Sequence, residues 1–215
     1  MLKKYILENR QQRDNIIQKL EQLNSVQEAK YDEDFEIYDE TGGYAIVLKS
    51  TQGDYILRIL ESIRDTEPNK NWEQFVKHGY SNIVEVIFFK EFGQYYLVLM
   101  DKLEPLDSDE REFIRNISLM FNNILTPLPH YISDKGISVS EAIKQNVHDL
   151  IGKANRYLLP KIQEIIDNYN KYNDLIEDLD QMLQEYEGEV GSPYGDFHEG
   201  NIMKDKQENY KLIDL

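Results

Sequence analysis

The chain has 215 residues, with 24 Lys and Arg against 40 Asp and Glu, and its formal net charge is −16. This acidic balance argues against a protein whose main task is to grip nucleic acid or an anionic membrane. The absence of cysteine excludes disulfides and thiolate metal sites within the chain, and no apolar run reaches membrane-spanning length. We therefore expect a cytoplasmic protein with a full hydrophobic core, built as one large domain or two small lobes.

Residues 1–34 are predicted to form an N-terminal helical extension, because apolar residues recur between charged ones over the first 30 positions. The apolar register is broken between Glu8 and Asn15. Three interpretations fit this pattern: a helix packed on its own domain, two short helices, or a helix that binds a partner weakly.

Residues 35–103 change to a strand-like composition and predict an antiparallel sheet with one inserted helix. Two hairpins are expected, with turns at residues 52–54 and 92–94, each of which contains a glycine. The expected strands are 35–38, 44–49, 55–60, 83–89 and 95–100, and the expected helix is 72–78.

Residues 104–215 change again, to a helical pattern. Asp107 with Glu110, and Ser138 with Glu141, have the spacing of capping boxes ahead of apolar runs. A long apolar stripe then extends over residues 162–186, before glycines that end a helix. Strands in the first half and helices in the second predict an α+β protein in two lobes.

The strongest chemical signal is the segment 194–203, Tyr-Gly-Asp-Phe-His-Glu-Gly-Asn-Ile-Met, followed by an acid at position 214. Phosphoryl transfer from ATP requires Mg²⁺ on the phosphates, a carboxylate near the attacking hydroxyl group and a further metal ligand. A loop carboxylate at Asp196, an amide at Asn201 and an acid at Asp214 supply those groups. Mg²⁺ prefers such oxygen ligands.

This segment resembles the catalytic and metal-binding loops of the protein-kinase-like superfamily. Its G-D-x-H-x-G-N form is most similar to the branch of the aminoglycoside phosphotransferases and choline kinases. The resemblance implies that Asp196 is the catalytic base and that Asn201 and Asp214 bind Mg²⁺ in the presence of ATP. It also implies that His198 stabilises the loop, and that residues 35–215 form a two-lobed kinase-like fold with a reduced helical lobe.

The resemblance also places a nucleotide site in the first half of the chain. A Gly-Gly turn before a strand is similar to a degenerate glycine-rich loop over the phosphates, although such turns are common between strands. The strand at 95–100 is similar to the one that leads into an adenine-binding hinge, with Met100 as gatekeeper. The residues assigned to the nucleotide in this way are Gly42, Gly43, Val47, Met100, Lys102 and Leu103.

Arg58 stands where the family carries a strand-three lysine. Arginine keeps the charge but presents a planar fork in place of a point charge. Lys49, on the preceding strand, is the alternative phosphate contact, similar in position to the substitute found in with-no-lysine kinases. The expected carboxylate partner of this cation is Glu73, with Glu61 as the less favoured choice.

Two classes of function follow. The first is an ATP- and Mg²⁺-dependent phosphotransferase with a hydroxyl acceptor, slightly favouring protein Ser/Thr over a small-molecule alcohol. The second is a non-catalytic kinase-like module that binds and regulates a partner protein, which Arg58, the degenerate glycine loop and the lack of an activation segment after Asp214 favour. Transfer of another group, such as AMP, is a third possibility that no residue specifically supports.

Overall fold

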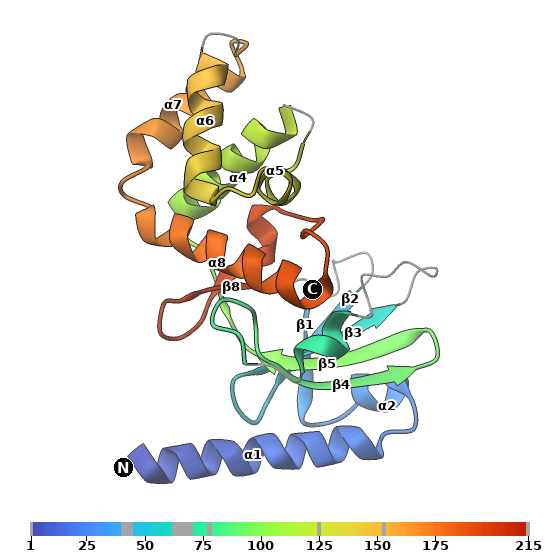
Figure 1. The fold of residues 1–215 in the computed structure, drawn as a ribbon. Helices are drawn as coiled ribbons and strands as arrows, with labels where there is room; N and C mark the ends of the chain where they lie inside the picture. The colour runs from blue at the N-terminus through green and yellow to red at the C-terminus, as the bar shows by residue number, and fades with distance from the viewer. Residues whose placement is uncertain are drawn as a thin grey trace. The chain divides into compact units, whose positions relative to one another are not determined.

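The computed structural model describes residues 2–39, 45–61, 71–76, 79–123, 126–151 and 154–213. The chain divides into two compact units (Figure 1). The sheet unit comprises Met1–Gly79 and Val84–Lys102, and the helical unit comprises Tyr80–Ile83 and Leu103–Asp214. A sheet unit followed by a helical unit confirms the predicted α+β class.

The sheet unit is built on five antiparallel strands in the order β1-β2-β3-β5-β4. The strands are β1 (Phe35–Asp39), β2 (Ala45–Ser50), β3 (Tyr55–Glu61), β4 (Val86–Phe92) and β5 (Tyr95–Asp101). Gly53 and Gly93 lie in the two hairpin turns with φ of 110° and 62°, a backbone region that glycine enters without steric cost. Both predicted hairpins are therefore confirmed.

The strand predicted at 83–89 begins later than expected, at Val86. Ile83 instead forms a bridge with Leu212 in the helical unit, and Leu212 donates its N–H to the carbonyl of Asn82 at 2.9 Å. Ile83 is 1% exposed. The apolar side chain of Ile83, which led to the strand prediction, is therefore buried in the core of the helical unit.

Helix α1 (Leu2–Gln22) is continuous through the break that the sequence predicts between Glu8 and Asn15. The break comes later, before α2 (Val26–Lys30), which Ser25 caps by accepting the N–H of Glu28. Ile16 and Leu20 are buried in one cluster with Leu57 and other strand residues. Figure 1 shows α1 along this face of the sheet. The N-terminal helices thus pack on their own sheet.

Lys90 on β4 holds the C-terminus of α1. Its Nζ donates to the carbonyls of Leu20 at 3.4 Å, Glu21 at 2.7 Å and Leu23 at 2.8 Å. These last carbonyls of a helix lack intrahelical partners and carry partial negative charge. We expect Lys90→Met to lower the free energy of unfolding by about 1–2 kcal/mol in urea denaturation. The exposed neighbour Glu91→Gln is the control, and an unchanged Lys90→Met protein would contradict the capping role.

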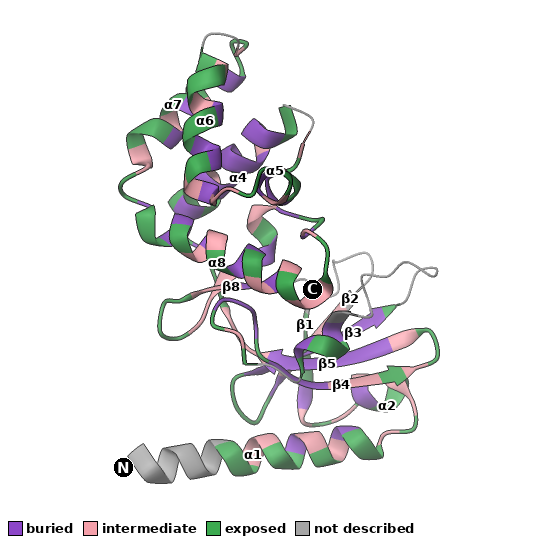
Figure 2. Ribbon diagram, in the orientation of Figure 1, coloured by how far each residue is buried: buried purple, intermediate pink, exposed green. Residues whose placement is uncertain are grey.

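The helical unit contains five helices longer than one turn and a small antiparallel sheet in the order β6-β7-β8 among its described residues. These elements are α4 (Ser108–Asn123), α5 (Leu128–Lys135), α6 (Val139–Ile151), α7 (Leu158–Asn168), α8 (Asn173–Val190), β6 (Glu104–Pro105), β7 (Ile202–Lys204) and β8 (Tyr210–Leu212). Buried residues run along α4 and through the central strands of the sheet unit (Figure 2). No helix in the described part of the chain is both long and apolar enough to cross a membrane.

Both predicted capping boxes are confirmed at the starts of α4 and α6. Asp107 Oδ1 accepts the N–H of Glu110 at 2.8 Å, and Glu110 Oε2 accepts the N–H of Asp107 at 3.1 Å. Ser138 and Glu141 make the same reciprocal pair, at 3.2 and 3.0 Å. Each pair satisfies two amides that a helix N-terminus leaves without partners.

The apolar stripe over residues 162–186 belongs to two helices, not to one. Helix α7 ends at Asn168 and α8 begins at Asn173. Tyr172 at the junction is 7% exposed, and its ring centroid lies 4.5 Å from that of Phe113 on α4. The chain therefore turns around a buried aromatic contact, and neither glycine nor proline marks this turn in the sequence.

Candidate active site

The loop 194–201 joins α8 to β7 and is anchored by buried aromatic residues. The ring of Tyr194 packs edge-on against Tyr186, with centroids 4.9 Å apart. The carbonyl of the buried Phe197 accepts a hydrogen bond from Ser118 Oγ on α4 at 3.1 Å. Between these anchors, the side chain of Asp196 is 73% exposed. The loop therefore presents one carboxylate to solvent from a fixed backbone.

Asn201 is buried beneath this carboxylate. Its Nδ2 donates to Tyr194 Oη at 2.9 Å, to the Asp196 carbonyl at 2.9 Å and to Asp196 Oδ2 at 3.3 Å. Since Nδ2 makes all of these hydrogen bonds, the amide is held in one orientation. Its oxygen, Oδ1, is then the atom that could bind a cation. The structure thus brings together Asp196 and Asn201, which the sequence assigned to one site.

His198 lies beside the same carboxylate. Its Nδ1 accepts the N–H of Gly200 at 3.0 Å, so the neutral ring carries its hydrogen on Nε2. Nε2 is 3.6 Å from Asp196 Oδ2. A Cβ at position 200 would lie 2.7 Å from His198 Cε1, which explains the glycine there. The loop-stabilising role expected of His198 agrees with the Gly200 contact, and its place beside Asp196 is an additional feature.

Asp214 lies outside the described residues, but the strand that leads to it is described. Strands β7 and β8 form an antiparallel hairpin, and the N–H of Ile213 donates to the carbonyl of Asn201 at 3.0 Å. The chain therefore returns to Asn201 one residue before Asp214. No group of three or more His, Asp or Glu that could hold a metal ion lies within the described ranges. An amide oxygen and neighbouring carboxylates fit Mg²⁺ that arrives with substrate phosphates.

A buried carboxylate ties this hairpin to α4. Glu110 Oε1 accepts hydrogen bonds from Lys204 Nζ at 2.6 Å and from Tyr210 Oη at 2.7 Å, and Glu110 is 5% exposed. Burial and the bond to Glu110 together raise the pKa of Tyr210 far above its ordinary value. Burial lowers the pKa of Lys204, but the hydrogen bonds and negative charges of Glu110 and Glu208 together outweigh burial, and the pKa of Lys204 is raised. Both partners of Glu110 therefore stay protonated.

These raised pKa values predict an alkaline limit to stability. A group whose pKa is higher in the folded state than in the unfolded state stabilises the fold. This stabilisation is complete below the unfolded pKa, which is near 10.0 for Tyr210. It is lost as the pH rises towards the folded pKa. We expect the melting temperature to fall above about pH 10. Thermal unfolding followed from neutral to alkaline pH measures this fall, and Tyr210→Phe should make it shallower. An equal fall in both proteins would contradict the assignment.

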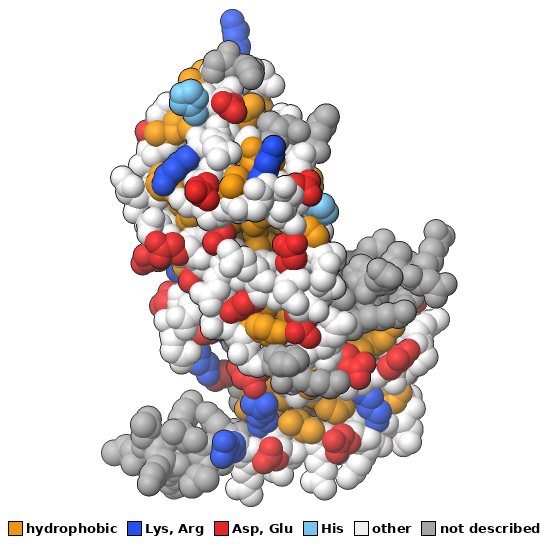
Figure 3. All heavy atoms as spheres, viewed as in Figure 1, with side chains coloured by type: hydrophobic (Ala, Val, Ile, Leu, Met, Phe, Trp, Pro, Cys, Tyr) orange, Lys and Arg blue, Asp and Glu red, His pale blue; other side chains and the backbone are white. Residues whose placement is uncertain are grey.

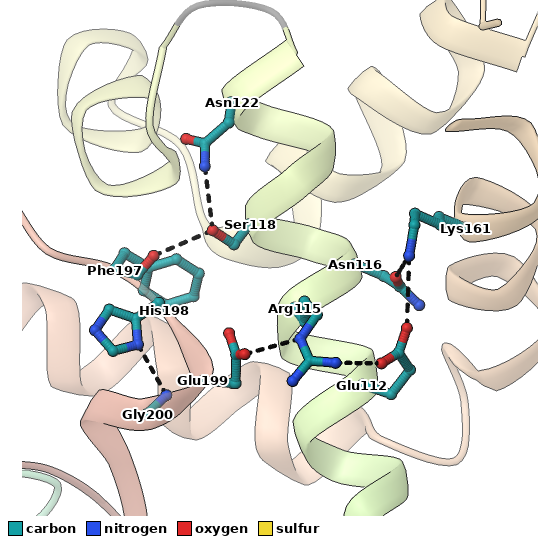
Figure 4. A network of polar contacts seen from close by, with 10 residues as sticks. All are labelled: Glu112, Arg115, Asn116, Ser118, Asn122, Lys161, Phe197, His198, Glu199 and Gly200. Carbon is teal, nitrogen blue, oxygen red and sulfur yellow. Dashed lines mark hydrogen bonds and ion pairs between the residues drawn. The ribbon is translucent and has the colours of Figure 1, made fainter. Parts of the chain in front are cut away.

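Arg115 on α4 holds the other side of the loop. Its Nε donates to Glu199 Oε1 at 2.8 Å, and its Nη1 donates to Glu112 Oε2 at 2.9 Å. Glu112 also lies 3.6 Å from Lys161 on α7, so the contacts continue from the loop across α4 (Figure 4). Burial alone would raise the pKa of Glu199, but the bond from Arg115 lowers it. Sequence reasoning missed Arg115, because 84 positions separate it from Glu199.

The candidate nucleotide residues of the sheet unit share one face. Val47 pairs with Arg58, and Ile56 pairs with both Lys49 and Met100 across the antiparallel strands. Directly paired residues point to the same side of a sheet, and alternate residues along a strand also share a side. All of these side chains therefore lie on the face opposite to the one that α1 covers.

The two candidate phosphate contacts differ in their surroundings. The guanidinium carbon of Arg58 lies 5.3 Å from the centroid of the Trp72 ring, and Trp72 is buried on α3 (Asn71–Phe75). Glu73, the next residue, is exposed, and its pairing with Arg58 stays a prediction. Lys49 Nζ lies 3.9 Å from Glu36 Oε1 on β1, a contact between two exposed groups.

Met100, Lys102 and Leu103, the residues predicted to form a hinge, are described, whereas Gly42 and Gly43 lie outside the described residues. Met100 is 5% exposed, as a gatekeeper side chain would be. The N–H of Lys102 donates to the carbonyl of Asp54 at 2.8 Å and is therefore already used. The contacts of the Lys102 and Leu103 backbone with adenine stay a prediction.

Comparison with known proteins adds little to this geometry. No family model matches the chain, and no curated protein matches it. One similar solved structure is that of Rad53 1–466 in complex with AMP-PNP, at 16% sequence identity and a TM-score of 0.38. The match covers 84% of this chain but only 38% of the Rad53 chain. A likeness of this size does not assign a function.

Proposed function

We propose that this chain is a kinase-like phosphotransferase that moves the γ-phosphoryl group of ATP, bound with Mg²⁺, to a hydroxyl group. The observation that carries the proposal is the arrangement of Asp196 and Asn201. An exposed carboxylate stands 3.3 Å from the nitrogen of a buried amide whose orientation three hydrogen bonds fix. A base beside a metal ligand is the pair that phosphoryl transfer requires.

In this proposal the side chains have separate tasks. Asp196 accepts the proton of the attacking hydroxyl, and His198 lies beside its carboxylate, with Nε2 3.6 Å from Oδ2. Asn201 and Asp214 would hold Mg²⁺, which neutralises charge on the phosphates when bound. Arg58 or Lys49 would contact the phosphates from the shared face of the sheet. The exposure of Asp196 suits a Ser or Thr hydroxyl presented by another protein.

One observation favours a second candidate, a kinase-like module that binds a partner protein without catalysis. The Arg58 guanidinium lies over the Trp72 ring, and a cation held in this way gains from staying there. A lysine in the family position would present a mobile point charge to the phosphates instead. If Arg58 stays on Trp72 when nucleotide binds, transfer would be weak or absent.

Two measurements on the purified chain separate these candidates. The first is a thermal-shift titration with ATP and Mg²⁺, and the second is label transfer from [γ-³²P]ATP to dephosphorylated casein, choline or kanamycin. A raised melting temperature with labelled casein supports the proposal, and labelled choline or kanamycin would reassign the acceptor to a small alcohol. A raised melting temperature without any labelled product supports the second candidate. No effect of ATP in either assay would contradict the phosphotransferase and leave the partner-binding module as the proposal.

Variants of the two cations refine the test. If Arg58 contacts phosphate, Arg58→Ala raises the KM for ATP while Arg58→Lys restores it, because lysine supplies the same charge in the form that the family uses. Lys49→Ala is the matched variant on the same face of the sheet. The reverse pattern, with Lys49→Ala impaired and Arg58→Ala unaffected, would transfer the role to Lys49.

We also expect Arg115→Gln to lower kcat by about tenfold, because loss of the Glu199 contact loosens the loop that carries Asp196. Its effect on the free energy of unfolding should be small, since the ion pairs of Arg115 are half exposed and screened by solvent. Kinetics and urea denaturation on one preparation measure both. Arg111→Gln, an exposed change on the same helix, is the control. An Arg115→Gln protein with wild-type kcat would show that the loop holds its shape alone.

A further inference from the structure

A groove with a volume of about 380 Å³ lies between α6 and α7, in the helical unit. Its walls are mostly apolar and include Ile143 and Val147 from α6 and Ile165 and Ile166 from α7. None of the residues described above as candidates for catalysis or nucleotide binding lines it. A pocket of this size and composition is typical of binding sites in proteins.

Two side-chain contacts join the walls of the groove. Tyr169 at the end of α7 shares a hydrogen bond of 2.6 Å with Ser140 Oγ on α6. Lys144 Nζ lies 5.2 Å from the centroid of the same ring. These two contacts join the helices across one end of the groove. A preformed groove spares a partner the cost of ordering it.

Exposed apolar side chains are concentrated at this end of the helical unit. Within the described part of that unit, each large hydrophobic residue that is strongly exposed belongs to α6, α7 or the turn between them: Ile151, Tyr157, Leu159 and Ile166, at 49%, 66%, 44% and 38%. Figure 3 shows hydrophobic side chains among both basic and acidic ones over α6 and α7. Apolar patches rimmed by polar groups mark protein interaction sites.

The charge of the groove is opposite to that of the chain. Lys144 and His148 lie one turn apart on α6 at the rim, and none of the described residues that line the groove is acidic. Asp149 lies 3.8 Å from His148 but does not line it. The whole chain, by contrast, carries a net charge of −16. Among the described residues that line the groove, Lys144 is thus the one that carries a formal charge, and this positive charge beside apolar walls favours a negatively charged occupant.

We propose that this groove docks an acidic amphipathic helix of a partner protein. A helix laid between α6 and α7 places apolar anchors at i, i+4 and i+7 over Ile143, Val147 and Ile166, and carboxylates beside Lys144. A second copy of the chain fits less well. Its acidic helix α8 has its apolar side buried and offers no free apolar face to the groove. The proposal does not depend on phosphotransferase activity.

The test is a selection of 16-residue helical peptides, displayed as a random library, on the full chain. Enriched peptides should be acidic, with apolar residues at helical spacing, and should bind with a Kd of about 1–100 μM. Ile166→Asp, an exposed position, should weaken them by at least about tenfold. Tyr31→Asp changes an exposed apolar residue of the sheet unit, 78% exposed, and should leave binding unchanged.

Reversal of one charge decides the chemistry of the occupant. Lys144→Glu should weaken the enriched peptides, and copies in which Lys replaces each acid should bind this variant better than the wild type. Enriched peptides that are basic, or that Ile166→Asp leaves unaffected, would overturn the proposal, as would a library that yields no binder. Sedimentation tests for a second copy of the chain in the groove. If the mass doubles as the concentration rises, and Ile166→Asp restores the mass of the monomer, the groove binds a second copy and the proposal is overturned.

Discussion

Replacement of Asp196 by asparagine is expected to lower kcat for phosphoryl transfer by about 10³-fold, because a positioned general base contributes a factor of this order. Asparagine keeps the shape of the side chain but cannot accept the hydroxyl proton. Because Asp196 is 73% exposed and lies over a loop anchored by other residues, the folded structure should not change. Steady-state kinetics with ATP and the acceptor found for the wild type provide the measurement.

Nucleotide binding supplies the internal control for this variant. The shift in melting temperature with ATP and Mg²⁺ should persist in Asp196→Asn, since Asn201 and Asp214 are the proposed metal ligands. Asp134→Asn, an exposed acid on α5, removes one negative charge elsewhere in the helical unit and should leave kcat unchanged. Transfer by Asp196→Asn at more than a tenth of the wild-type rate would exclude Asp196 as the base.

Replacement of Glu110 by alanine is expected to lower the free energy of unfolding by about 3–5 kcal/mol, the usual cost of removing one partner of a buried ion pair. The change would leave Lys204 Nζ and Tyr210 Oη without the acceptor they now share, and would open the capping box at Asp107. Lys204 is 17% exposed, so water restores little of the loss. The variant should also become less active, because the hairpin β7–β8 positions Asn201.

Urea denaturation at neutral pH measures this effect. The matched control is Asp109→Ala on the same helical turn, whose contact with Lys171 is exposed and should contribute less than about 1 kcal/mol. The double change Glu110→Met with Lys204→Met should recover part of the loss, since apolar pairs often replace buried ion pairs at little cost. A loss of less than about 1 kcal/mol in the free energy of unfolding of Glu110→Ala is the loss expected for a surface ion pair. Such a result would contradict the buried network.

The sequence alone predicted features that depend on neighbouring residues. The capping boxes at Asp107 and Ser138 formed as expected, because each joins groups only three positions apart. The turns at Gly53 and Gly93 formed because glycine enters positive φ without steric cost. Asp196 and Asn201 were assigned to one site from their spacing, and a short loop brings them within hydrogen-bonding distance.

Contacts between distant residues were not predictable in the same way. Arg115 and Glu110 stand among the polar positions of a helix in the sequence. Their contacts with Glu199 and Tyr210 lie 84 and 100 positions further along the chain, so local spacing does not predict them. Arg58 aligned with a phosphate-binding lysine, yet its guanidinium lies over Trp72, whose place depends on how α3 packs.

By itself, then, the sequence determined the class of fold, the caps and turns, and the loop that holds the candidate site. These features depend on turn geometry and on hydrophobic periodicity, which involve residues only a few positions apart. They can therefore be predicted from the order of residues along the chain. Only the tertiary structure decided that Ile83 joins the helical unit, that residues 162–186 form two helices, and that Glu110 and Arg115 hold the site. These outcomes depend on which buried surfaces meet when distant segments pack, and that choice is made by the whole chain at once.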